Sequence, residues 1–186
     1  TRLGDEDNGC IINTAILAAS KPNQISICVN KLNHTHDMIM ESKEFTVSIL
    51  SEKATFDVFE RFGFHSGKDV NKFENYEFCK RSNNDIYYIT EGTNGYISAK
   101  VDKIIDLGSH TMFIGEISDM EMLNDDVSLT YDYYHKHIKP KPIEKTSNET
   151  IWRCTICGYE YKGEELPEDF ICPICKHPAS DFVKGE

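Results

Sequence analysis

The amino-acid sequence predicts a mostly β domain, of barrel or sandwich type with a few short helices, followed by a small ribbon held by a metal. Three observations support this prediction. Short runs rich in β-branched residues recur through residues 1–138, residues 139–150 have the composition of a linker, and residues 151–186 contain two closely spaced pairs of cysteines.

The strand predictions rest on alternating apolar and polar residues between turn residues. Lys21-Pro22-Asn23 separates the first two strands, the segment EFTVSIL alternates, and Gly108-Ser109 is expected to turn a long hairpin. Two short helices are expected to interrupt the strands. The predicted strands are 11–19, 24–30, 44–50, 95–107 and 110–122, and the predicted helices are 35–42 and 55–62.

The chain is expected to divide into a domain at 1–138, a linker at 139–150 and a metal-binding ribbon at 151–186. The linker, KPKPIEKTSNET, contains two prolines, one aliphatic residue and no aromatic residue. Such a composition is semi-stiff where prolines are frequent and flexible elsewhere. Fully extended, the linker reaches at most ~40 Å, which allows the ribbon to meet its own domain or a partner subunit.

Charge and apolar patterning favour a soluble, cytoplasmic protein without a nucleic-acid or membrane partner. The net charge is −11, acidic and basic residues are interspersed, and no basic stripe is present. No apolar run approaches the ~20 residues that span a bilayer, and nothing resembles a signal peptide. Seven cysteines, an odd number, fit metal-binding thiolates better than a disulfide framework.

The C-terminal cysteines have the spacing of a tetrahedral metal site. Cys154 and Cys157, like Cys172 and Cys175, are separated by two residues, and 14 residues lie between the pairs. Two residues between cysteines allow both thiolates of a tight turn to face one ion, and two such turns complete a tetrahedron. A ribbon of this size also needs a metal to fold. A site of four thiolates accepts either iron or zinc.

The residues around these cysteines resemble rubredoxin. The segments WRCTICGYEY, LPEDFICPIC and ASDFV carry the resemblance, with Gly158 after the first pair and Pro173 inside the second. The resemblance implies iron that passes single electrons, with zinc as the alternative. Two features depart from the family: the segment between the pairs is short, and Lys176 stands where glycine is usual. The residues that match the family's aromatic core are Trp152, Tyr159, Tyr161, Phe170 and Phe182.

The segments NGCIINTA at 8–15, FGFHSG at 62–67 and GSHTMFIGEI at 108–117 resemble the flavin reductase-like family. The resemblance covers roughly residues 5–125, although the family's FxxxSG element lacks its common spacing. It implies a split β-barrel that binds FMN, usually at a homodimer interface. Family members normally have a further strand, and often a helix, before the first of these segments. Either such residues precede Thr1 and add to the flavin pocket, or the barrel edge is supplied in another way.

The same resemblance implies a set of cofactor-binding residues. Residues 30–36 end a strand and open a helix, and a helix start offers N–H groups to a phosphate. Asn33 or Thr35 could instead be only an N-cap. His110 matches a histidine on the nicotinamide side in relatives, although an ordinary strand-end histidine fits as well. The candidate flavin-binding residues are Asn13, Thr14 and Ala15 for the ring, Asn30, Lys31, His34, Thr35 and His36 for the phosphate, and Ser66 and Gly67 for the flavin or the partner subunit.

The two parts together resemble the high-molecular-weight rubredoxins. This resemblance implies a homodimeric electron-transfer oxidoreductase in which NAD(P)H reduces FMN, and the rubredoxin iron passes electrons to an acceptor such as a flavodiiron oxygen or nitric oxide reductase. A second hypothesis is a reductase of free flavin or ferric chelates whose metal module serves for docking. A third is a non-enzymatic interaction protein with a zinc ribbon.

Overall fold

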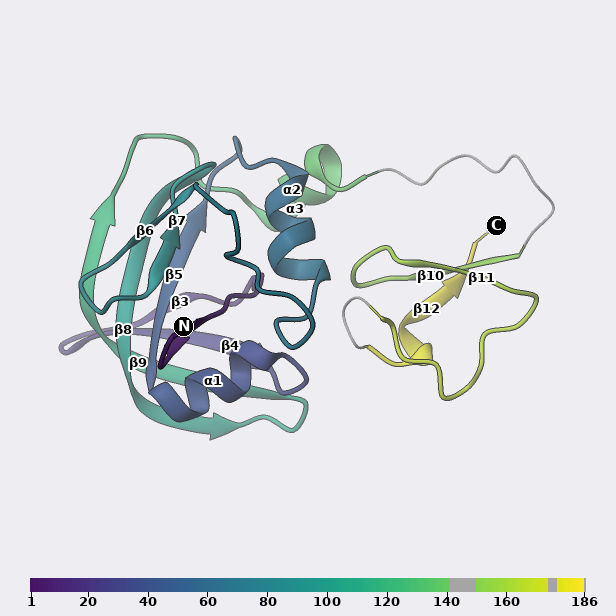
Figure 1. Cartoon of the computed structure of the whole chain (residues 1–186), viewed down its shortest axis with the longest axis horizontal. Coiled ribbons are helices and arrows are strands. Elements are labelled where there is room, and N and C mark those ends of the chain that lie inside the picture. The colour runs from purple at the N-terminus through teal and green to yellow at the C-terminus, as the bar shows by residue number, and fades with distance from the viewer. Residues whose placement is uncertain (141–149, 174–176, 186) are drawn as a thin grey trace.

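The computed structural model describes residues 1–140, 150–173 and 177–185 and contains two bodies, a curled β-sheet domain and a small C-terminal ribbon (Figure 1). Most elements are strands, and the helices are few and short. The predicted mostly β class is therefore confirmed. None of the helices in these described residues is long and apolar enough to cross a membrane.

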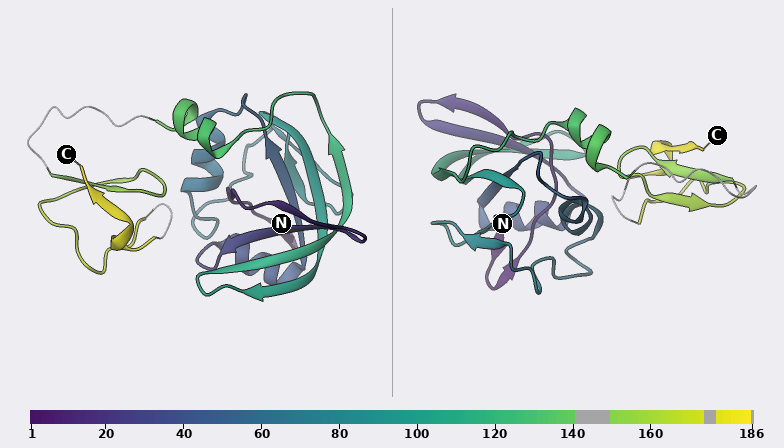
Figure 2. Two further views of the ribbon diagram at one scale, coloured as in Figure 1. Left: turned by 180° about the vertical axis from the view of Figure 1, so that it is seen from behind. Right: turned by 90° about the horizontal axis from the view of Figure 1, so that it is seen from above.

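Five antiparallel strands form the main sheet in the order β3-β4-β9-β8-β5. Strands β8 and β9 form the predicted long hairpin, and its ladder shifts register twice, which bends the hairpin and lets the sheet curl (Figure 2). The bounds of the five strands are β3 Ile16–Ser20, β4 Asn23–Asn30, β5 Glu44–Leu50, β8 Thr93–Asp106 and β9 His110–Met122.

Smaller elements cover the curled sheet. Helix α1, His34–Ser42, lies across it, and helix α2, Phe56–Phe59, continues directly into a π-helical turn, Glu60–Phe64. After β9, helix α3, Tyr131–Tyr133, continues into a second π-helical turn, Tyr134–Ile138. Two short hairpins complete the domain: β1 Arg2–Leu3 with β2 Glu6–Asp7, and β6 Cys79–Arg81 with β7 Tyr87–Ile89.

The core of the domain follows from the alternation along β4. Ile25, Ile27 and Val29 of this strand are each at most 3% exposed, while the residues between them are partly exposed. They pack against one face of α1 and against the inner face of the other strands. The remaining buried members of this cluster are Ile39, Phe45, Ala99 and Phe113.

The predicted strand at 11–19 is wrong in its first part, because regular pairing starts only at Ile16. Extending the register places Thr14 opposite Cys28. There the Thr14 hydroxyl donates to the Cys28 carbonyl at 3.0 Å and accepts from the Cys28 N–H at 3.1 Å. A side chain thus takes the place of the backbone ladder, and residues 8–15 leave the sheet.

The C-terminal ribbon is a three-stranded sheet in the order β11-β10-β12, with β10 at Ile151–Cys154, β11 at Glu160–Lys162 and β12 at Phe182–Lys184. A single 3-10 turn, Ala179–Asp181, precedes β12. The aromatic residues expected in its core do pack around the buried cysteines and Phe182. Phe170, for example, lies edge-on to Phe182 with ring centroids 5.4 Å apart.

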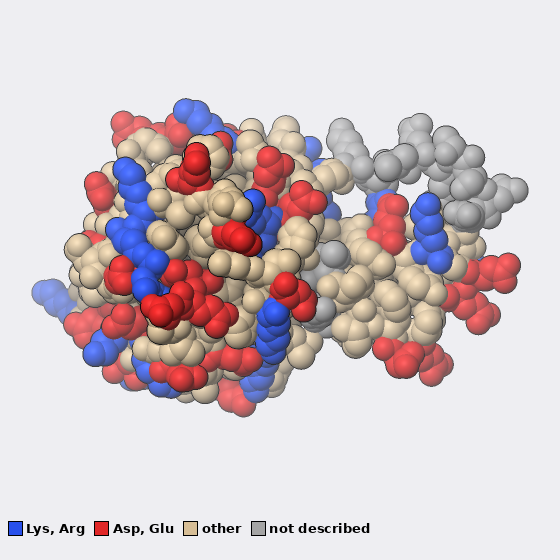
Figure 3. Space-filling view, in the orientation of Figure 1, with Lys and Arg blue, Asp and Glu red and all other residues tan. Residues whose placement is uncertain are grey.

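Acidic and basic side chains lie side by side over the face in Figure 3, as their interspersion in the sequence predicts. On this face, blue side chains form one short run over the barrel, and red side chains lie directly beside it. This surface therefore has the mixed charge that the sequence indicated.

Gly115 on β9 is expected to be essential for the close approach of the barrel strands. A Cβ atom there would lie 2.9 Å from the Ala99 Cβ and 3.1 Å from the Phe45 ring. Gly115→Ala should lower the free energy of unfolding by about 1–3 kcal/mol, the usual cost of overpacking, as measured by chemical denaturation. Glu116→Ala, at the exposed neighbouring position, is the control; equal stability of the two variants would contradict this account.

Candidate functional site

Three of the four predicted metal ligands meet in the ribbon. Cys154, Cys157 and Cys172 are buried, and their sulfur atoms all lie within 4.8 Å of one another. Cys154 ends β10, Cys157 follows in the tight turn, and Cys172 comes from the opposite loop. The fourth predicted ligand, Cys175, lies outside the described residues.

The sulfur spacing fits a metal rather than a disulfide. The Cys157 and Cys172 sulfurs are 3.5 Å apart, whereas a disulfide bond is about 2.05 Å long. Four thiolates held tetrahedrally about 2.3 Å from an ion lie about 3.8 Å from each other. The donor set and its spacing therefore fit a soft ion such as iron or zinc.

The turn after the first pair of cysteines supports this geometry. Gly158 has a φ of +84°, a conformation that glycine adopts without strain. It allows the Gly158 N–H to donate to the Cys154 carbonyl at 2.9 Å, and brings the Tyr159 N–H to 3.5 Å from the Cys157 sulfur. Hydrogen bonds of this kind to thiolates tune a metal site.

A second candidate site is a hollow between the start of α1 and the π-helical turn Glu60–Phe64. Four residues from the predicted flavin set line it, namely His34, Thr35, Ser66 and Gly67. The other lining residues are Asn8, Cys10, Ile11, Leu32, Asn33, Phe62, Gly63, His65 and Lys72. We call this hollow the α1 hollow.

Two side chains of the α1 hollow carry buried polar atoms that lack a partner. The Asn8 Nδ2 and the His34 Nδ1 make no hydrogen bond to any residue that the structure describes. Asn8 is only 2% exposed, and its Oδ1 already accepts from the Gly9 N–H at 2.9 Å. Because buried donors are nearly always paired, the free Asn8 N–H groups indicate a ligand with acceptor atoms.

The start of α1 adds to this electrostatic character. Within the described part of the chain, no side chain caps its first turn, although Asn33 occupies the N-cap position. The N-cap interpretation of Asn33 or Thr35 is therefore not supported by a cap hydrogen bond. An uncapped helix start bears a partial positive charge and unpaired N–H groups, so the α1 hollow suits an anion such as a phosphate.

Lys72 is a buried cation in the wall of the α1 hollow. Its Nζ donates to the carbonyls of Gly9 at 2.8 Å and Phe62 at 3.1 Å, which ties the segment before the sheet to the π-helical turn. Burial lowers the pKa of Lys72 and raises the pKa of the neighbouring Cys10 thiol. Both shifts follow from the loss of water around a charged form.

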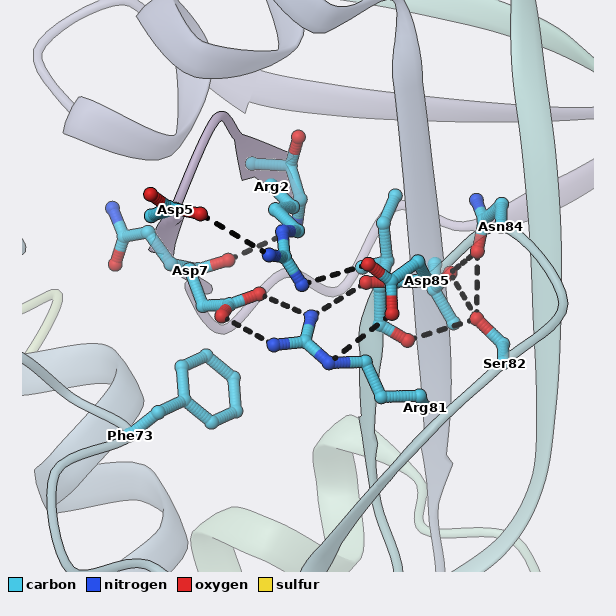
Figure 4. A network of polar contacts seen from close by, with 12 residues as sticks. Arg2, Asp5, Asp7, Phe73, Arg81, Ser82, Asn84 and Asp85 are labelled. Atoms are coloured by element: carbon cyan, nitrogen blue, oxygen red, sulfur yellow. Dashed lines mark hydrogen bonds and ion pairs between the residues drawn. The ribbon is translucent and has the colours of Figure 1, made fainter.

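An ion-pair network joins the two short hairpins of the domain beside Asn8 in the sequence (Figure 4). Arg81 donates from two nitrogens to the two carboxylate oxygens of Asp7, each at 2.8 Å, and also pairs with Asp85. Bidentate pairs of this kind fix geometry as well as charge. The hairpin β1–β2 is thereby fastened to the hairpin β6–β7, and Asn8 follows directly.

The other predicted flavin-site residues lie outside the α1 hollow. His110 is opposite Asn30 at the end of the β4–β9 ladder, with its Nδ1 2.9 Å from the Ser109 hydroxyl. Lys31 forms an ion pair with Asp106, and His36 bonds Thr111 and Asp37. Asn13, Thr14 and Ala15 lie at the entry to β3, where Thr14 bonds Cys28.

Sequence reasoning did not select Asn8 or Lys72 as site residues, although both belong to motifs that carried the family resemblance. Asn8 opens the segment at 8–15, and Lys72 with Phe73 completes the FG…SG…KF element. The motifs by themselves did not indicate what either side chain does. The roles of both residues depend on burial, and the spacing of residues along the sequence does not show which side chains are buried.

The chain belongs to the flavin reductase-like family and carries a rubredoxin-like domain. The profile described as the flavin reductase like domain matches residues 1–141, and that of the rubrerythrin, rubredoxin-like domain matches residues 152–183. This confirms the predicted combination of a flavin reductase-like barrel and a rubredoxin-like ribbon.

Two curated relatives show how far the likeness extends. The high molecular weight rubredoxin of Moorella thermoacetica is 31% identical over 203 residues, which cover 94% of this chain and 88% of the relative. The chain thus matches such a two-domain protein along nearly its whole length. A ferric-chelate reductase (NAD(P)H) of Archaeoglobus fulgidus is 40% identical over 133 residues, 72% of this chain and 78% of the relative.

Solved structures show the same fold for the barrel. An FMN-binding protein from Thermus thermophilus aligns with a TM-score of 0.59 and 17% identity, covering 65% of this chain and 66% of that one. An NADH:FAD oxidoreductase from Streptomyces globisporus aligns with a TM-score of 0.57 and 21% identity, covering 64% and 70%. These similarities confirm the predicted split-barrel fold.

Proposed function

We propose that this chain is an NAD(P)H-dependent flavoprotein oxidoreductase that passes electrons through FMN to a rubredoxin-type iron and on to an acceptor protein. One observation carries the proposal: a single chain holds both a buried thiolate cluster and an uncapped helix start with an unpartnered amide. The division proposed is residues 1–138 for the flavin, 139–150 as linker and 151–186 for the metal.

The α1 hollow fits the phosphate of FMN. The Asn8 amide and the Thr35 hydroxyl are donors, and the first turn of α1 adds backbone N–H groups. Gly67 makes room, because a Cβ atom at this position would collide with the Asn8 amide. Lys72 holds the two walls of the hollow together through the Gly9 and Phe62 carbonyls.

The remaining candidate residues are proposed to surround the flavin ring. Asn13, Thr14 and Ala15 form the exposed entry to β3, and His110 lies at the end of β9 beside Asn30. We assign the first three to the ring and His110 to the nicotinamide side. When bound, FMN would supply a hydride acceptor for NAD(P)H, and the iron would supply single-electron exchange.

The rubredoxin-like ribbon is proposed as the exit of this electron path. Cys154, Cys157 and Cys172, with Cys175, would saturate the iron with thiolates, which suits electron exchange rather than bond chemistry. The acidic surface of the chain suits a basic docking patch on the acceptor. We propose an acceptor of the flavodiiron type and a cytoplasmic setting.

A second candidate function is reduction of ferric chelates or free flavin by the barrel alone. The 40% identity to a ferric-chelate reductase over 72% of this chain favours it. In that case the ribbon would serve only for docking, with iron or zinc.

The metal ligands provide the direct test of the two-site proposal. Cys172→Ser should abolish the absorption bands of ferric thiolate but leave the reduction of bound flavin by NADH unchanged, because the ligand lies in a separate fold. Loss of both in the variant would refute this division of labour.

If the variant keeps full turnover with physiological acceptors, including ferric chelates, the second candidate is favoured. Purified protein with neither flavin nor iron bands would exclude both and leave a zinc-ribbon interaction protein.

Asn8→Asp tests the phosphate site. Asp keeps the acceptor for the Gly9 N–H, but replaces the free donor with a negative charge. FMN affinity should fall by about tenfold or more, the loss expected for a hydrogen bond to a charged group, as measured by titration of apoprotein. Asn71→Asp is the matched control, since its Oδ1 likewise accepts from a backbone N–H, that of Phe73, but at an exposed position. Equal affinities for the two variants would place the phosphate elsewhere.

A homodimer is proposed because apolar side chains are exposed along one part of the sheet. All of β3 is exposed, including Ile16 at 65% and Leu17 at 68%, and Ile104, Ile105 and Leu107 are exposed at the end of β8. Large apolar patches and open edge strands commonly mark interfaces.

Light scattering should therefore give about twice the chain mass of 21.3 kDa. Leu17→Glu should yield monomers, because it buries a charge in the contact. Val127→Glu, at a comparably exposed apolar position of 65%, should remain dimeric. A monomeric parent protein would contradict the proposal.

A further inference from the structure

The ribbon packs against the barrel at an aromatic residue of the π-helical turn. Phe64, the last residue of this turn, contacts the apolar cluster formed by Cys154, Cys157, Cys172 and Phe182. Phe64 is itself held by Phe56 of α2, with ring centroids 5.4 Å apart. Figures 1 and 2 show the ribbon beside α2 and α3 from each side.

The same π-helical turn lines the α1 hollow on its other side. Phe62 and Gly63, the two residues before Phe64, are in the wall of the hollow. Phe62 is 3% exposed and packs against Phe73 and Tyr76, with ring centroids 5.2 and 5.5 Å away. Phe62, Gly63 and Phe64 are consecutive residues, so one π-helical turn lines the α1 hollow and also contacts the thiolate cluster.

A second segment approaches the same cysteine turn. A Cβ atom at Gly158 would lie 3.3 Å from the Lys139 side chain, which follows the second π-helical turn. Tyr134 of that turn stacks on Phe59 of α2 with ring centroids 4.4 Å apart. Two helical segments that pack on each other therefore both lead to the ribbon, one through Phe64 and the other through Lys139.

We propose that the ribbon, described at residues 151–173 and 177–184, docks in cis on Phe64 and so lies against the π-helical turn that lines the α1 hollow of the same subunit. The partner of the surface around Phe64 is thus the chain's own ribbon. Phe64 acts as a positioning residue. The docking is argued from contacts alone. Only its role, which is to bring the thiolate cluster close to the flavin site, rests on the proposed function. The contact at Phe64 is apolar and needs no charge pairing, so it should resist salt.

Photo-crosslinking of the full-length holoprotein tests this arrangement. Phe64→p-benzoylphenylalanine keeps an aromatic ring at the contact, and should crosslink to peptides of residues 151–184 in a product of monomer mass. A product of twice that mass, or no crosslink to the ribbon, would overturn docking in cis. Phe78→p-benzoylphenylalanine is the control, since Phe78 is 49% exposed on the barrel and is not part of the ribbon contact; it should not capture the ribbon.

Phe64→Ala supplies a second measurement in case the photoreactive residue distorts the contact. Loss of a packed aromatic pair, about 0.5–1.5 kcal/mol, should lower the ratio of docked to undocked protein about two- to tenfold. Small-angle scattering should show an increased maximum dimension, and reduction of the iron by NADH should slow, by at most the same factor, while flavin reduction does not. Phe78→Ala should change neither, and an unchanged scattering profile in Phe64→Ala would contradict the proposal.

The outcomes separate this inference from the proposed function. A monomer-mass crosslink in a protein whose iron is not reduced through the flavin would retain the docking and refute the electron path. Iron reduction at the parent rate in both Phe64 variants, without a crosslink, would retain the path and refute the docking.

Discussion

The structure depends on the helical run from Phe56 to Phe64, which is wedged into the barrel on one side and meets the ribbon on the other. Val58, Phe59 and Phe62 anchor it, each at most 5% exposed. An aromatic anchor of this size contributes several kcal/mol through burial and cannot shift without opening the core. The π-helical turn at its end is therefore fixed, and so are the two surfaces it presents, the wall of the α1 hollow and the contact at Phe64.

Electrostatic constraints complete the α1 hollow. The bidentate pair of Arg81 and Asp7 fastens the first hairpin, and the buried Lys72 joins the carbonyls of Gly9 and Phe62. Burying a cation is costly unless its hydrogen bonds are satisfied, so these contacts specify one arrangement of the walls. The Asn8 amide is then left facing the start of α1 with unpaired donors. That combination of a helix dipole and a desolvated donor is the physical basis of the anion site proposed here.

The ribbon obeys a different rule, because its fold and its metal are coupled. Its small sheet surrounds the sulfur atoms, and the aromatic rings pack directly on the cysteines. Ligands this close and this buried require an ion to offset the repulsion and desolvation of the thiolates. The barrel supports itself through β4, α1 and the β8–β9 hairpin. The two bodies thus have independent sources of stability, which is what separate redox roles require.

The sequence by itself determined features that depend on local spacing: the clustering of Cys154, Cys157 and Cys172, the long hairpin and the alternation along β4, each of which the structure confirms. The linker at 139–150 and the ligand Cys175 stay predictions, because residues 141–149 and 174–176 lie outside the described part of the chain. It failed at 11–15, where the Thr14 hydroxyl replaces backbone pairing with Cys28, because side-chain competition for a ladder leaves no periodic signal. Only the tertiary structure joined Asn8, His34, Gly67 and Lys72 around one hollow, and placed Phe64 between that hollow and the thiolates. Local patterns record which face of an element is apolar, whereas these contacts arise from how distant elements pack.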